Sequence, residues 1–134
     1  MSRRTDQRRA AVIALYQHDL TGVELGAAFA RDAPVFTRAL AYATDDHREE
    51  LDALISAHAQ GWKLERIAPL ERNILRVALL ELLHPELVAG DTPIPPEGAI
   101  DEAVETAKTF CGVDAPGFVN GILGAVQRER TAAA

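Results

Sequence analysis

Four arginines stand within the first ten residues of the chain, where they could bind phosphate. These are Arg3, Arg4, Arg8 and Arg9, and Asp6 is the one acidic residue among them. This segment therefore carries +3, whereas the whole chain carries −6 and the remainder −9. A guanidinium can fork onto a phosphate and stack on a base, which a lysine ammonium cannot do. The charges indicate either a nucleic-acid contact or a solvated tail.

An aromatic residue follows the basic segment at helical spacing. Residues three and four positions apart share a helix face, so Arg9, Ile13 and Tyr16 form one stripe, with Arg8 beside it. Binding of unpaired RNA needs cations for the phosphates and flat groups on which bases stack. Tyr16 lies either at the margin of such a surface or in the core with its hydroxyl at the rim. We count the adjacent Gln17 among the candidate RNA contacts.

Two further groups of residues invite a functional interpretation. Asn120 and Gly121, beside Phe118, could offer RNA a polar edge and a closely approached backbone, although helix packing through a small residue explains the glycine equally well. Arg76 and Glu81 interrupt an otherwise apolar stretch. They form either a buried ion pair or rim charge that fixes the fold, or part of a surface that receives another protein.

Patterns typical of enzymes and metal sites are missing from the sequence. The histidines are scattered, no HExxH pattern occurs, and Cys111 has no cysteine partner. There is no P-loop or GxGxxG pattern, and no spacing singles out an acid and base pair. We therefore expect no catalytic residue, no metal and no cofactor. The histidines are His18, His47, His58 and His84.

Apolar residues recur at spacings of three and four along almost the whole chain, which predicts an all-α protein. Gly22 should end the first helix and Pro85 should follow the end of the central one. Gly90 and the prolines 93, 95 and 96 mark the clearest linker. The helices expected cover about 5–21, 23–30, 34–58 (one helix, or two joined near Asp45 and Asp46), 69–83, 100–111 and 116–130.

Length and composition limit how the chain can be organised. With 134 residues, 48% of them apolar and 25% charged, it should fold as one domain around an aliphatic core. No apolar run is long enough to span a membrane and no signal peptide is visible, so we expect a cytoplasmic protein. We expect a single domain over 1–134, with a basic arm over 1–8 and a flexible tail over 131–134.

Four sequence blocks together resemble the NusB family. They are RRAAVIALYQ at 8–17, ERNILRVALLEL at 71–82, AIDEAVETAKTF at 99–110 and GFVNGIL at 117–123. The resemblance extends from about Arg8 to Val126 and is weakest between residues 20 and 62. Asp101, Thr106 and Gly124 depart from the family pattern, which has asparagine, leucine and often an acidic residue there.

The resemblance implies a compact bundle of about seven helices in two packed three-helix subdomains. It also implies recognition of boxA-type single-stranded nascent RNA together with NusE, a ribosomal protein of the small subunit. The pair would join other Nus factors on the RNA polymerase elongation complex, support transcription of ribosomal RNA operons, and perform no catalysis. On this basis Arg72, Arg76 and Glu81 are candidates for the partner surface.

Two other interpretations remain open from the sequence. One is a protein-interaction module or homodimer without direct RNA binding. The other is the NusB-like targeting domain of an RNA methyltransferase, which would require a catalytic domain with a cofactor site elsewhere in the protein.

Overall fold

Helices make up most of the part of the chain that this computed structural model describes, residues 3–88 and 93–133. Within those ranges no strand occurs, which confirms the all-α prediction. The α-helices are α1 (Arg4–Thr21), α2 (Leu25–Ala28), α3 (Val35–Asp46), α4 (Arg48–His58), α5 (Pro69–Leu83), α6 (Pro96–Phe110) and α7 (Ala115–Ala133), and short 3₁₀ turns cover Leu64–Arg66 and Pro85–Leu87.

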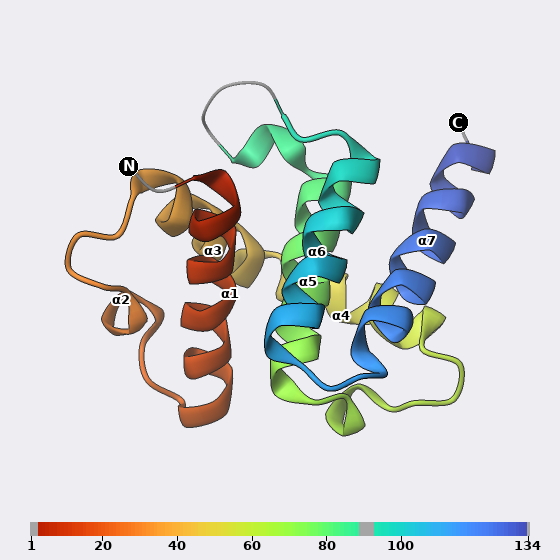
Figure 1. Cartoon of the computed structure of the whole chain (residues 1–134), viewed down its shortest axis with the longest axis horizontal. Coiled ribbons are helices and arrows are strands. Elements are labelled where there is room, and N and C mark those ends of the chain that lie inside the picture. Colours follow the sequence, from red (N-terminus) through yellow and green to blue (C-terminus); the bar gives the residue numbers. More distant parts are fainter. Residues whose placement is uncertain (1–2, 89–92, 134) are drawn as a thin grey trace.

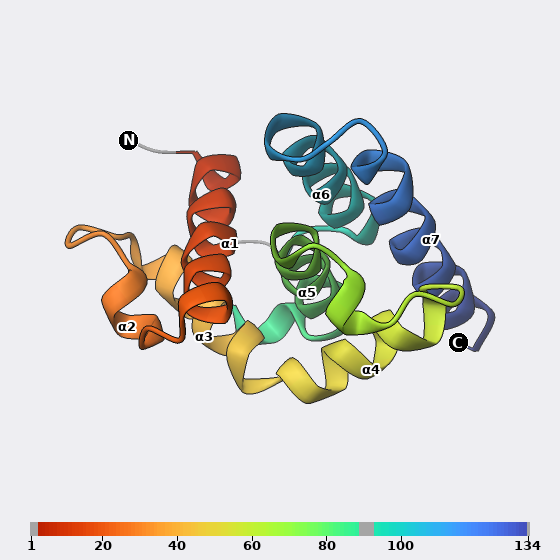
Figure 2. The ribbon, with the colours of Figure 1, turned by 90° about the horizontal axis from the view of Figure 1, so that it is seen from below.

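Helix α5 forms the centre of the molecule, as Figure 2 shows by viewing it nearly end-on among its neighbours. Every residue from Asn73 to Leu82 is buried, because the sequence is apolar on nearly all faces of this helix. Pro69 occupies the first turn, where its missing N–H is not needed, and the helix ends at His84 before Pro85. Helices α1, α3, α4, α6 and α7 all pack against α5.

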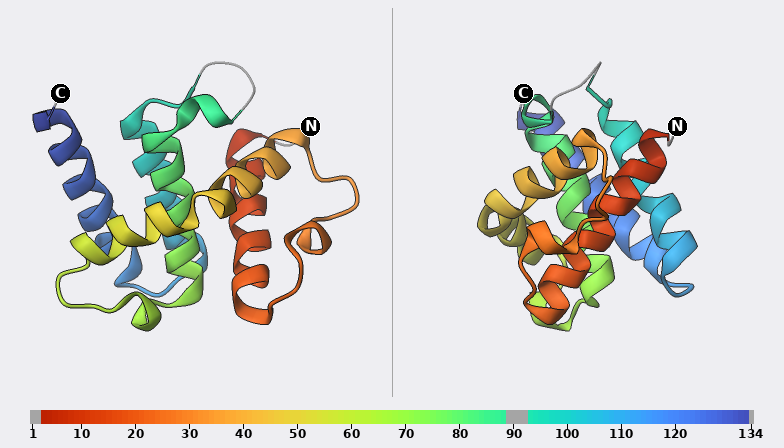
Figure 3. Two further views of the ribbon diagram at one scale, coloured as in Figure 1. Left: turned by 180° about the vertical axis from the view of Figure 1, so that it is seen from behind. Right: turned by 90° about the vertical axis from the view of Figure 1, so that its left-hand side faces the viewer.

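The remaining helices form two groups around this centre (Figure 1). Helices α1, α2 and α3 lie together at one end of the molecule, and α6 and α7 pack on the other side of α5. Figure 3 shows α3 and α4 running in succession across the back, from one group to the other. Helices α1 and α6 both lie on α5 and flank a shallow groove, which we call the seam.

Several helices end where the sequence predicts, because residues at these positions have strong backbone preferences. Gly22 adopts a left-handed conformation with φ of 77° and donates its N–H to the carbonyl of His18, which ends α1. The segment 34–58 forms two helices, because His47 at their junction departs from helical geometry with φ of −105° and ψ of 16°. The two-helix alternative is therefore correct.

Other boundaries differ from the prediction. Helix α6 begins at Pro96, one turn before the expected Ile100, because proline fits the first helical position and Pro95 precedes it in an extended conformation. Helix α1 includes residues 4–8 of the expected arm, and α7 continues through residues 131–133 of the expected tail. Residues 1–2, Gly90 of the expected linker and Ala134 lie outside the described residues.

Helices long and apolar enough to cross a membrane are not found among the described residues.

Candidate nucleic-acid interface

The four arginines of the basic segment lie in different surroundings. Arg3 is exposed at the start of α1, and the guanidinium of Arg4 lies 4.2 Å from the ring centre of Phe36 on α3. The guanidinium of Arg9 lies 5.9 Å from the ring centre of Phe110 at the end of α6. Arg4 and Arg9 therefore place positive charge beside aromatic rings on two sides of α1.

Arg8, in contrast, is paired inside the molecule with Glu81 of α5. Its Nε and Nη2 donate to the two carboxylate oxygens of Glu81 at 2.9 and 3.0 Å. The side chains are only 12% and 5% exposed. Burial raises the pKa of Glu81 more than Arg8 lowers it, and the nearby carboxylate of Glu102 raises it further. Of the two interpretations of Glu81, the structure shows the buried ion pair.

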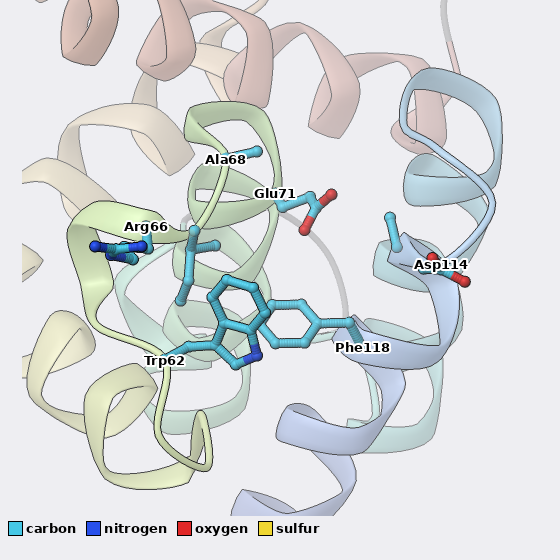
Figure 4. Close-up of a pocket in the computed structure, with 8 residues that line it drawn as sticks. Trp62, Arg66, Ala68, Glu71, Asp114 and Phe118 are labelled. Carbon is cyan, nitrogen blue, oxygen red and sulfur yellow. The ribbon is translucent and has the colours of Figure 1, made fainter.

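A pocket of about 330 Å³ lies where the loop after α4 meets the first turn of α7. Figure 4 shows the rings of Trp62 and Phe118 side by side along this pocket, with Arg66, Glu71 and Asp114 around its rim. Trp62 is 56% exposed, so its ring is available to a ligand. Partial burial raises the pKa of the Glu71 carboxyl. The pocket offers aromatic surface, one guanidinium and acceptors for hydrogen bonds.

The basic end of α1 and the pocket both lie near the C-terminal end of α6. Arg9 reaches Phe110, whose ring is 45% exposed and is followed in the chain by Cys111. Burial raises the pKa of the Cys111 thiol, and the negative charge of Glu71, which lines the pocket, raises it further. Phe110 therefore contacts the basic end of α1, and the residue after it feels the charge of a residue that lines the pocket. We group Arg9, Phe110, Trp62, Arg66 and Phe118 under the name basic-aromatic surface.

The basic-aromatic surface does not include the other predicted RNA contacts. Tyr16 is half-buried and Gln17 exposed, both about two turns beyond Arg9 on α1. Asn120 and Gly121 are exposed on α7, close in sequence to the pocket. A side-chain carbon added at Gly121 would meet no atom within 4 Å, so tight helix packing does not explain this glycine.

Arg72 and Arg76 are held in a network of charges between α1, α4 and α5. Arg72 donates to Asp19 through Nε and Nη2, at 3.1 and 2.9 Å. Arg76 donates to Asp19 through Nη1 at 3.0 Å and to both oxygens of Asp52, at 2.7 and 2.9 Å. Asn73 donates to Asp19 as well, at 3.0 Å. The guanidinium groups of Arg72 and Arg76 therefore bind partners within the protein.

This network changes the pKa of its central carboxyl group. Burial alone would raise the pKa of Asp19, but hydrogen bonds from Arg72 and Asn73 and the charges of Arg76 and Arg72 outweigh it. The pKa of Asp19 therefore lies below its ordinary value of 3.8. In the described part of the chain, no three histidine, cysteine or acidic side chains gather in a way that could hold a metal ion.

Comparison with known proteins identifies the group to which this sequence belongs. The sequence profile of the NusB family matches residues 5–128, which is nearly the whole chain. The chain belongs to the NusB family. Two curated relatives carry the name Transcription antitermination protein NusB. The one from Symbiobacterium thermophilum is 39% identical, covering 100% of this chain and 94% of its own length. The one from Rubrobacter xylanophilus is 38% identical, covering 92% and 88%.

Solved NusB structures share the fold. A T. maritima NusB has a TM-score of 0.81 at 32% identity, covering 96% of this chain and 92% of its own. A structure described as antitermination factors NusB and NusE in complex with dsRNA has a TM-score of 0.78 at 27% identity, covering 94% and 96%. A chain in a structure described as a plectonemic RNA supercoil has a TM-score of 0.83 at 28% identity, covering both chains fully.

Trp62 and Arg66 of this NusB-family chain were missed as candidates by sequence reasoning. Trp62 follows Gly61, which has a φ of 88°, and lies in a loop, where a large exposed ring is uncommon. That exposure could not be inferred from the sequence. Phe118 lies near Trp62 because α7 packs beside the loop that follows α4.

Proposed function

We propose that this NusB-family chain is a transcription antitermination factor that binds boxA-type nascent RNA together with NusE. The observation that carries this proposal is the solved relative described as NusB and NusE in complex with dsRNA, which matches the fold over 94% of this chain. The names of the two curated relatives support the role in antitermination. Through NusE and other Nus factors, the complex would act on elongating RNA polymerase and support transcription of ribosomal RNA operons.

The basic-aromatic surface supplies what unpaired RNA requires. Arg9 and Arg66 provide guanidinium groups for phosphates, and Phe118 and Trp62 provide adjacent rings on which bases stack. Glu71 and Asp114 at the pocket rim accept hydrogen bonds from base amino groups, which gives the pocket a means of discriminating between bases. Arg3 and Arg4 extend the positive surface along the start of α1. The remaining predicted contacts with RNA are Tyr16, Gln17, Asn120 and Gly121.

The acidic remainder of the chain suits a basic ribosomal protein as the partner. The residues after the first ten carry a net charge of −9. This charge attracts a basic protein over long range and speeds its association. Arg72, Arg76 and Glu81 would support docking indirectly, since their ion pairs fix α5 against α1 and α4.

The proposal includes no catalysis and places the protein in the cytoplasm, where bacterial transcripts are made. Both curated relatives are antitermination proteins that this chain covers over 88% or more of their length. This favours an antitermination factor over the targeting domain of an RNA methyltransferase.

The test is a titration of fluorescein-labelled RNA with this chain, with and without NusE. A boxA-type RNA, a scrambled RNA and a double-stranded boxA RNA are compared at several salt concentrations. We expect the single-stranded boxA-type RNA to bind most tightly, and NusE to increase its affinity. Phe118→Leu retains most of the packing volume but loses the stacking surface. It should cost about 1–3 kcal/mol of binding free energy.

Tyr42→Leu is the matched control. Tyr42 is also a partly exposed aromatic residue, but it lies on α3, away from the basic-aromatic surface. Its substitution should leave RNA affinity unchanged. Equal affinity for boxA-type and scrambled RNA, with and without NusE, would refute the proposed function.

A further inference from the structure

Polar contacts cross the seam between α1 and α6, beside the apolar residues that also line it. At its floor, the guanidinium of Arg8 and the carboxylate of Glu81 form a fork with hydrogen bonds of 2.9 to 3.1 Å. Nearer the helix start, Thr5 Oγ1 donates to Glu102 of α6 at 2.7 Å. These contacts attach the first two turns of α1 to both α5 and α6.

The first two turns of α1 depend on such contacts because they contribute no buried residue. The first buried residue of this helix is Ala11. Arg3, at the N-cap, makes no side-chain hydrogen bond to the free N–H groups of the first turn. Thr37 of α3 adds a hydrogen bond to the carbonyl of Gln7, at 3.0 Å. Side-chain contacts from α3, α5 and α6 therefore determine where this end of the helix lies.

Arg8 lies between two arginines whose guanidinium groups lie against different helices. Arg4, one turn earlier, lies over Phe36 of α3, whereas Arg9, the next residue, lies over Phe110 of α6. A helix turns by about 100° per residue, so fixing Arg8 on α5 also fixes the directions of both neighbours.

The surroundings of Glu81 oppose the transfer of Arg8 to an RNA phosphate. Glu81 is almost completely buried, and the carboxylate of Glu102 is close enough to repel it. Removing Arg8 would leave a buried charge without its partner, which costs more than a contact at the exposed surface returns. Arg8 therefore remains on Glu81 when RNA binds.

We propose that Arg8 and Glu81 are positioning residues for RNA binding, which hold α1 so that Arg4 and Arg9 meet the phosphates. Arg8 itself is then no phosphate ligand, although its place in the basic segment suggests one. This inference rests on the proposed function, since it assigns roles within the same RNA-binding surface.

The experiment compares Arg8→Met with the double variant Arg8→Met, Glu81→Leu, which replaces the buried pair by apolar side chains. Each protein is titrated with fluorescein-labelled boxA-type RNA across a series of salt concentrations, and amide hydrogen exchange is followed at residues 7–12, the first amides of α1 with a helical hydrogen bond. Arg8→Met should weaken binding several-fold and speed exchange. The double variant should restore both, with affinity within about twofold of the unmodified chain and the same salt dependence.

Arg9→Met is the matched control, because it removes the guanidinium that lies beside the exposed ring of Phe110. It should lower the slope of log K against log salt by about 0.7, and adding Glu81→Leu should not rescue it. If the double variant binds as weakly as Arg8→Met and its slope also falls by about 0.7, Arg8 is a phosphate ligand and the inference is overturned.

The amide exchange separates this inference from the proposed function. If the unmodified chain binds no RNA, alone or with NusE, the proposed function fails. Exchange at residues 7–12 that is unchanged by Arg8→Met would overturn the positioning role even then, because the pair would not anchor the helix.

Discussion

Asp19 ties α1 to α5, and its removal should be among the most damaging single changes to the fold. Its carboxylate accepts hydrogen bonds from Arg72, Asn73 and Arg76, and its side chain is 19% exposed. Asp19→Ala leaves two largely buried guanidinium groups without a shared acceptor. Removing one partner of a buried ion pair costs about 3–5 kcal/mol.

The loss expected for Asp19→Ala lies at the lower end of that range. Arg76 keeps its two hydrogen bonds to Asp52, and Arg72 keeps those to the carbonyls of Leu64 and Ile67. We expect a decrease of about 3 kcal/mol in the free energy of unfolding. In a chain of this size that corresponds to a fall in Tm of roughly 12 °C. Urea denaturation followed by circular dichroism measures the first quantity, and a thermal scan measures the second.

A matched control and the dependence on pH make this prediction specific. Asp101→Ala, at an exposed position of α6, should change stability by no more than about 0.5 kcal/mol. Because the pKa of Asp19 is lowered in the folded state, its contribution is complete above its ordinary value of 3.8 and disappears as pH falls through the folded-state pKa. The stability gap between the unmodified chain and Asp19→Ala should therefore narrow in acid. A gap below about 1 kcal/mol at neutral pH would refute this account of the network.

Two further predictions concern pH and backbone conformation. His58 donates from both ring nitrogens, to the carbonyl of Leu54 at 2.9 Å and to Glu129 at 2.8 Å, and these contacts raise its pKa despite burial. This stabilisation is present below the ordinary pKa of 6.5 and is lost as pH rises through the raised pKa of His58. Glu129→Gln should therefore destabilise the chain more at pH 6 than at pH 8.5. Equal losses of stability at both pH values would contradict this role of His58. Gly22→Ala should lower the free energy of unfolding in urea by about 1–2 kcal/mol, because the backbone of Gly22 is in the left-handed conformation. Gly112→Ala is the control, since Gly112 does not have a positive φ, and an equal loss of stability there would contradict this reason.

The sequence predicts those parts of the fold that depend on neighbouring residues. Gly22, Pro69 and Pro85 set helix ends through their own backbone preferences, so these boundaries agree with the structure. The start of α6 was placed one turn too late because a proline was interpreted as part of a linker, although Pro96 suits a first helical position. Phe110 continues the apolar spacing of Ala103 and Ala107, but it is the last residue of α6 and its ring reaches solvent.

The candidate site was less predictable because it depends on contacts between distant residues. Arg72 and Asp19 are 53 positions apart in the chain, and Arg8 and Glu81 are 73 apart. Nothing in the local pattern shows that Arg8 is paired inward while Arg9 faces an exposed ring. Phe118 could be singled out from its block, but its position beside Trp62 follows from the packing of α7.

Photo-crosslinking of boxA-type RNA that carries 4-thiouridine tests the central claim most directly. With NusE present, we expect the crosslinked peptides to contain Trp62, Phe118 and the start of α1, and a scrambled RNA to give few crosslinks. Crosslinks concentrated on the back of the molecule, along α3 and α4, would contradict the assignment of RNA binding to the basic-aromatic surface.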